Sequence, residues 1–158
     1  MGRIYTHSMP DTSIAATANL DVLTLPVGAN IPVAIHEITL YQRTLTSWEE
    51  KPLQLIRYSG AYTLGSGGTG TLTPQKHNFN DTATAITTAR YGDTTAVTSG
   101  TATIIRNDSF VLLNGYFYLP APEDRIIISV SQALVVRLPV ALSGTTSFTG
   151  SITYEELA

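Results

Sequence analysis

The sequence contains no cysteine, which excludes disulfide frameworks, thiol catalysis and zinc sites built on thiolates. Charge is also scarce, because Asp, Glu, Lys and Arg together make up 13% of the 158 residues, about half of the ~25% of an average soluble domain. Lys51 and Lys76 are the only lysines, and the formal net charge is −3. Without a basic patch to release counterions, the chain is not expected to bind nucleic acid.

Long hydrophobic runs are missing as well. No apolar stretch approaches the ~20 residues that a membrane helix needs. The segment Met1–Ala18 has no charged region followed by an apolar one, so no secretory signal is expected. We therefore expect a soluble protein that is made in a cytoplasm and has no membrane partner.

The residues that are present suit one domain that assembles with other chains. Hydrophobic residues make up 43% of the sequence, enough for a core that needs neither metal nor disulfides. Threonine is the commonest residue, and it forms strands while tolerating water. A surface of Thr, Ser and Gly with few charged side chains does little to keep neighbouring molecules apart, so stable assembly is expected. A monomer with a neutral surface is the alternative.

Short apolar runs separated by turn residues predict β-strands throughout the chain after residue 19. The runs are Leu20–Leu25, Val33–Gln42, Leu53–Tyr58, Thr101–Arg106, Phe110–Leu119, Arg125–Ser131, Ala133–Val140 and a last strand carrying Phe148, Ile152 and Tyr154. About eight such strands predict an all-β fold, a jelly-roll-like antiparallel β-sandwich formed by residues 20–158. Residues 1–19 show no regular period and are expected to form an extended N-terminal arm, with a disordered terminus as the alternative.

Two of these strands are apolar on both faces. Ile126–Val130 and Leu134–Leu138 each lack the alternation of a strand that is exposed on one side. In a sandwich, the second cover of such a strand often comes from another subunit. Tyr116, Phe117 and Tyr118 place aromatic rings on both faces of one strand, so one side is expected to join the core and the other to anchor an interface.

Patterns that could carry chemistry have structural interpretations. Gly65, Gly67 and Gly70 satisfy G-x-G-x-x-G, but Thr71–Pro74 follows where a dinucleotide site needs a helix, so a flexible hairpin loop is expected. The histidines His7, His36 and His77 are isolated in sequence and lack the spacing of metal ligands. We therefore expect no catalytic, metal-binding or cofactor-binding residues, although folding could still gather histidines and acids into a cluster.

Four segments resemble small virion proteins of tailed phages, the head decoration or cement proteins. They are Val33–Leu40, the Gly65–Gly70 loop continuing into Thr73 and Pro74, Phe117–Arg125 and Gly150–Glu156, with Tyr118-Leu119-Pro120-x-Pro122-Glu123 the most specific part. The resemblance implies a jelly-roll-like protein, usually trimeric, that sits on the major capsid protein of an icosahedral shell and has no enzymatic activity. Gln75–Asn80 departs from the charged, proline-rich linker of that group, which leaves the role of this loop open.

The resemblance gives specific expectations. The protein would reside on the virion surface after assembly in the host cytoplasm, and its partners would be the major capsid protein and copies of itself in a homotrimer. The candidate capsid-contacting residues of the arm are Ile4, Tyr5, Met9 and Ile14, and those of the subunit interface are Tyr116, Tyr118, Ile127 and Val135.

Two alternatives belong to other functional classes. One is a carbohydrate-binding jelly-roll module of a tail fibre or host-recognition protein, in which Trp48 and the aromatic residues of Tyr116–Tyr118 would stack on sugar rings. The other is an enzyme on a cupin-like barrel, which would need His and carboxylate ligands around a metal.

Overall fold

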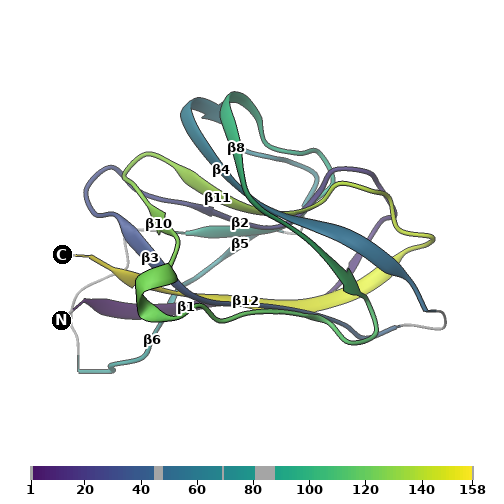
Figure 1. The fold of residues 1–158 in the computed structure, drawn as a ribbon, viewed down its shortest axis with the longest axis horizontal. Coiled ribbons are helices and arrows are strands. Elements are labelled where there is room, and N and C mark those ends of the chain that lie inside the picture. The colour runs from purple at the N-terminus through teal and green to yellow at the C-terminus, as the bar shows by residue number, and fades with distance from the viewer. Residues whose placement is uncertain (1, 45–47, 69, 81–87, 158) are drawn as a thin grey trace.

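The computed structural model describes residues 2–44, 48–68, 70–80 and 88–157 of the chain. Within them twelve strands form two sheets (Figure 1). In chain order the elements are β1 (Arg3–Ile14), β2 (Leu20–Pro26), β3 (Val33–Gln42), β4 (Glu50–Thr63), β5 (Gly70–Leu72), β6 (Gln75–Lys76), β7 (Ala89–Asp93), β8 (Thr98–Val111), β9 (Tyr116–Tyr118), the 3₁₀ turn η1 (Pro122–Asp124), β10 (Ile127–Ile128), β11 (Ala133–Leu138) and β12 (Thr146–Glu156).

The strand order is that of a jelly roll. Sheet A runs β10-β3-β12-β1-β6 with β9 also paired to β3, and sheet B runs β5-β7-β2-β11-β4-β8. The short strands β5, β6 and β7 aside, the chain alternates between the two sheets. Strands β1, β3, β9, β10 and β12 lie in sheet A, and strands β2, β4, β8 and β11 lie in sheet B. All pairings are antiparallel. This double Greek-key order confirms the predicted all-β sandwich.

The expectation of an extended N-terminal arm is wrong. Residues 3–14 form strand β1, which pairs with β12 over most of its length and with β6 at Tyr5 and Thr6. Tyr5, His7 and Met9 alternate into the core, but the histidine conceals this period in the sequence. The register then shifts between Met9 and Thr12, so the alternation is interrupted again near Pro10.

The main core lies between the sheets, and β12 supplies its most regular face. Phe148, Ile152 and Tyr154 are buried, while the intervening Ser and Thr side chains are partly exposed, as the alternation predicted. On the outer face of sheet A these hydroxyls meet those of neighbouring strands: Thr6 Oγ1 lies 2.8 Å from Thr153 Oγ1, and Thr39 Oγ1 lies 2.8 Å from Ser151 Oγ. A largely uncharged hydroxyl surface therefore covers the middle of this face.

The outer face of sheet B has a second, smaller core. Ile56, Tyr58, Ala133 and Val135 cluster there with Val97, and Tyr62 packs against them. Val97 belongs to the segment that joins β7 to β8, and this segment is bridged to the glycine-rich loop through Ser66 and Thr95. The second cover of β11 thus comes from its own chain. The expected subunit core along Leu134–Leu138 is wrong, because all six residues of β11 are buried within one molecule.

A buried ion pair lies beside this second core. Arg137 Nε and Nη2 donate to Asp21 Oδ1 and Oδ2 at 2.5 and 3.0 Å, and the Val97 amide donates to Asp21 Oδ2 at 2.6 Å. Arg137 Nη1 donates to the Tyr58 hydroxyl at 3.0 Å. Burial lowers the pKa of Arg137, but the hydrogen bonds and charge of Asp21 outweigh it and hold that pKa above its usual value. Asp21 and Arg137 therefore pair as opposite charges where they leave water.

The glycine-rich loop is packed against β7, which is a correction to the expected flexible hairpin. A Cβ atom at Gly65 would lie 2.5 Å from the Thr95 carbonyl oxygen, and one at Gly68 would overlap Asp93 and the Tyr91 carbonyl oxygen. The glycines are needed because two backbone segments approach each other closely. The G-x-G-x-x-G pattern has a packing role here and leads into strand β5 rather than a helix.

Candidate binding surface

A groove of about 620 Å³ runs along one side of the sandwich, between β8 of sheet B and β9 of sheet A. We call it the edge groove. It is lined by Ile105, Arg106, Phe117, Tyr118, Leu119, Pro120, Ala121, Asp124 and Ile126. The groove lies where the two sheets separate at their edges, so its walls come from segments that are distant in sequence.

Apolar side chains of this region remain exposed to solvent. Ile105, Phe117 and Leu119 in the groove are 38%, 56% and 62% exposed, and Ile127 on β10 is 48% exposed. Single exposed apolar residues are ordinary, but several gathered on one side of a molecule are typical of a surface that is covered by another molecule. The edge groove is therefore a candidate protein-binding surface.

A polar network between β8 and β9 forms one end of the groove. Arg106 donates from Nε and Nη2 to Asp108 at 3.0 and 3.3 Å, and the Tyr116 hydroxyl donates to Asp108 Oδ2 at 2.8 Å. The Arg106 guanidinium also lies 5.4 Å from the centre of the Tyr118 ring. These contacts tie the two sheets together at their open edge, so the groove has fixed walls.

The network shifts the ionisation of its members. Burial opposes ionisation of Asp108, but hydrogen bonds from Arg106 and Tyr116 outweigh it and hold the pKa of Asp108 below its usual value. Burial and the hydrogen bond to Asp108 raise the pKa of Tyr116. Both groups therefore keep their partners, a carboxylate and a neutral phenol, across the physiological range.

The residues predicted for a subunit interface are divided by the structure. Tyr116 and Tyr118 are buried and point inward between the sheets, and Val135 is buried in the second core. Only Ile127 is available to a partner. Phe117 is the outward aromatic residue of β9; the sequence could not show which face of Tyr116–Tyr118 would point outward, because both faces carry rings.

The residues predicted to contact a capsid through an arm are mostly unavailable. Tyr5, Met9 and Ile14 are buried core residues of β1, and Ile4 is half-buried on the opposite face. A contact through these side chains would require β1 to leave sheet A, where it pairs with β12 from Arg3 to Ile14.

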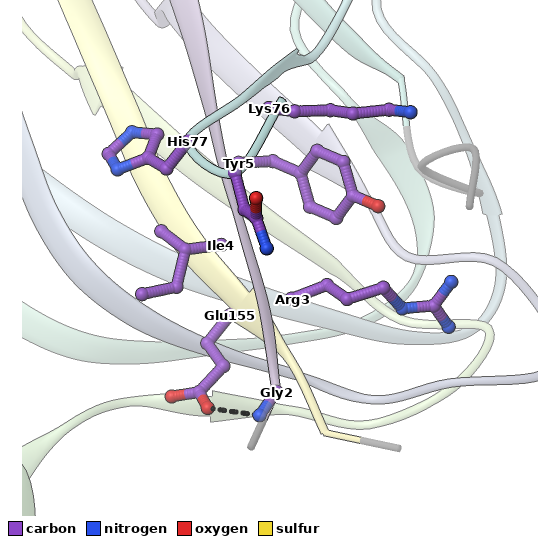
Figure 2. Close-up of a pocket in the computed structure, with 8 residues that line it drawn as sticks. Gly2, Arg3, Ile4, Tyr5, Lys76, His77 and Glu155 are labelled. Carbon is purple, nitrogen blue, oxygen red and sulfur yellow. Dashed lines mark hydrogen bonds between the residues drawn. The ribbon is translucent and has the colours of Figure 1, made fainter. Parts of the chain in front are cut away.

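A smaller depression of about 390 Å³ lies at the start of β1 (Figure 2). Gly2 donates its amide to Glu155 Oε1 at 3.0 Å, and Glu155 Oε2 lies 3.0 Å from His36 Nε2. In Figure 2, Arg3, Tyr5 and Lys76 extend to one side of the strand, whereas His77 and Glu155 lie on the other. The polar groups diverge, so this depression does not gather a reactive set.

The three histidines lie in separate environments. His7 is buried and stacks on Tyr154 with ring centres 5.4 Å apart, His36 contacts Glu155, and His77 Nε2 lies 2.7 Å from Thr6 Oγ1. In the part of the chain that the structure describes, no three His, Asp or Glu residues are grouped as metal ligands. Nor do the described residues include a helix with the length and hydrophobicity to cross a membrane.

Trp48 is 68% exposed just before β4. It is not among the residues that line the edge groove, and β4 begins beside Val111 at the far end of β8. With Tyr116 and Tyr118 turned inward, the aromatic platform expected for sugar stacking is reduced to Phe117 and a separate tryptophan.

Comparisons with models of protein families, with curated proteins and with solved structures gave no match to this chain. A functional proposal must therefore rest on the surface of the molecule itself.

Proposed function

We propose that this protein is a non-catalytic structural component of a virion, which binds the outer surface of an icosahedral phage head and stabilises the joints between major capsid subunits. The edge groove carries the proposal, because it exposes Phe117, Leu119 and Ile105 on a fixed sandwich edge. A protein that covers a joint adds buried apolar area to it, and shell symmetry repeats each contact many times.

Two further features support this proposal. The jelly-roll order of the strands recurs in viral capsid domains, which is an analogy at the level of fold, since lectins and cupins share it. The low charge of the chain also suits a protein that is held in a crowded assembly more than one that must stay apart from its neighbours. The groove then supplies the apolar anchors that such an attachment requires.

The test is cosedimentation with empty shells of the major capsid protein from the same genome. The wild-type chain is expected to sediment with shells, and the double variant Phe117→Ser/Leu119→Ser to bind at least about tenfold more weakly, since both anchors are lost. Phe79→Ser/Val140→Ser is the matched control, because it removes one aromatic and one aliphatic side chain that are also exposed but lie outside the groove.

Equal binding by the groove variant and the control would contradict a role for the edge groove, and a wild-type chain that stays in the supernatant would contradict the function. A chain that does not bind shells, but binds a glycan array and loses that binding in Trp48→Ala, would favour the carbohydrate-binding alternative over the proposed capsid-binding function.

A further inference from the structure

We propose that β8 pairs with β8 of a second copy of this chain about a two-fold axis at Asn107, which joins the two B sheets into one. This inference concerns self-association and does not depend on the proposed attachment to a capsid. It begins from β8, a strand of 14 residues at the end of sheet B. In the described part of the chain no strand pairs with its outer edge.

The edge of β8 carries only part of the usual protection against pairing. Every residue from Thr98 to Asn107 is exposed, and the strand contains neither proline nor lysine. Its ladder with β4 shifts register twice, between Leu55 and Ile56 and between Ser59 and Tyr62, which leaves Arg106–Val111 as an uninterrupted stretch. An exposed edge of this length offers a row of backbone donors and acceptors to another strand.

The other sheet edges are short or interrupted. On sheet B, β5 has three residues. On sheet A, β6 has two residues, and beyond it β1 carries Pro10 within a register shift. The remaining edge consists of β9 and β10, which are separated by Pro120, Pro122 and the η1 turn. Among the described strands, the edge that can match β8 over its length is therefore β8 of another copy.

Two copies of one strand can pair antiparallel about an axis perpendicular to the sheet. Directly opposed residues of an antiparallel pair lie on the same face, so this axis must pass through a residue position rather than between two residues. An axis at Arg106 or at Asp108 would place like charges directly opposite each other. An axis at Asn107 places Arg106 opposite Asp108 of the second copy, and does so twice.

Charge thus selects the register. Arg106 and Asp108 are the only charged residues of β8, and a two-fold axis at Asn107 is the one that places each of them opposite the other's counterpart in the second copy. Asn107 also lies inside the uninterrupted stretch. Arg106 and Asp108 already share a face and a hydrogen bond within one molecule, so pairing would create an alternating group of four charges. Each edge groove begins at Ile105 and Arg106, so the pairing would also bring the two grooves close to one axis.

The first experiment measures molar mass by light scattering with charge variants. The wild-type chain is expected at about 34 kDa, twice the 17.0 kDa of one chain. Arg106→Asp and Asp108→Arg each place like charges across the axis, so each variant alone is expected at the mass of one chain. An equimolar mixture of the two variants restores opposite charges at every contact and is expected to return to about 34 kDa, the mass of two chains.

The mixture separates pairing from folding, since both variants lose the internal contact between residues 106 and 108 whether alone or mixed. Circular dichroism of each variant verifies that it is folded before mixing. A wild-type mass of one chain, a mass of three chains, or a mixture that stays monomeric would overturn the inference.

The second experiment uses the absence of native cysteine. Two Asn107→Cys side chains would face each other across the axis at the spacing that a disulfide spans, so mild oxidation is expected to give a covalent dimer. Thr103→Cys is the matched control on the same exposed strand, where the two thiols would lie about 27 Å apart along the pair. Equal cross-linking of the two variants, or none by Asn107→Cys, would overturn the proposed axis.

Binding of the wild-type chain to shells is measured separately. A wild-type chain that is monomeric and binds shells would overturn the two-fold pairing and leave the proposed function standing. A dimer that does not bind shells would do the reverse.

Discussion

Gly68 shows how a single side chain decides local packing in this protein. A methyl group at this position would overlap Asp93 Oδ1 and the carbonyl oxygen of Tyr91, both on β7. The obstacle on one side is backbone, which cannot rotate away as the end of a flexible side chain can. The glycine pattern that resembled a nucleotide loop is thus explained by contact with a neighbouring strand.

Gly68→Ala is expected to lower the free energy of unfolding by about 1–3 kcal/mol, the usual cost of forcing extra atoms into a packed site. Gly144→Ala is the matched control, because nothing lies within 4 Å of its added methyl group. Urea denaturation of both variants measures the difference. Equal stability of the two would contradict the close packing of the loop on β7.

The sequence identifies the aromatic residues but does not by itself show which way their side chains face. The run Tyr116-Phe117-Tyr118 has no polar residue to mark its exposed side, and the structure turns only Phe117 outward. In β12 the hydroxyl residues mark the outer face, so there the orientation could be predicted correctly. Orientation is therefore predictable where polar and apolar residues alternate and ambiguous where they do not.

At the scale of elements, β11 illustrates the same limit. A strand that is apolar on both faces must be covered twice, but the sequence does not say by which chain. Here the second cover comes from the β7–β8 connection and the β4 side chains Ile56 and Tyr58. This cover depends on contacts between segments far apart in sequence, which strand periodicity does not reveal. Most of the other predicted strands match strands of the sandwich, but β1 was missed. The predicted runs Thr101–Arg106 and Phe110–Leu119 also divide differently, since β8 continues from Thr98 to Val111 and β9 covers only Tyr116–Tyr118.

Val135→Ala is expected to cost about 2–3 kcal/mol of unfolding free energy, since it removes buried methyl groups and leaves a cavity. Ile127→Ala, in the other strand predicted to be two-faced, is expected to cost less than about 1 kcal/mol, because its side chain is exposed. Chemical denaturation at a concentration at which the chain is monomeric checks both values. A Val135 variant as stable as wild type would mean that β11 is not covered by its own chain.

For the molecule as a whole, buried tyrosines set the alkaline limit of stability. Burial and the hydrogen bond to Asp108 raise the pKa of Tyr116, and burial together with the charge of Glu156 raises the pKa of Tyr154. In the unfolded chain both phenols ionise near their ordinary pKa of about 10. Because the folded-state values are higher, the stability that the neutral phenols contribute is intact below pH 10 and is lost as the pH rises above it.

The free energy of unfolding is therefore expected to fall between about pH 10 and pH 12, by up to about 1.4 kcal/mol per pH unit for each of the two tyrosines. A double variant Tyr116→Phe/Tyr154→Phe should show a shallower fall, and Tyr41→Phe, whose ring is exposed, should follow the wild type. Denaturation curves across this range measure the slopes. An unchanged slope in the double variant would contradict the assignment.

Arg3 and Glu156 are register partners in sheet A, and both ends of the described chain leave the sandwich together (Figure 1). The chain therefore enters and leaves the domain at one small area of its surface. A longer polypeptide could carry this jelly roll between two of its own segments without spanning the width of the domain, since adjoining termini are what insertion into another chain requires. Because the two ends are adjacent, a short linker could also join them into a circular chain.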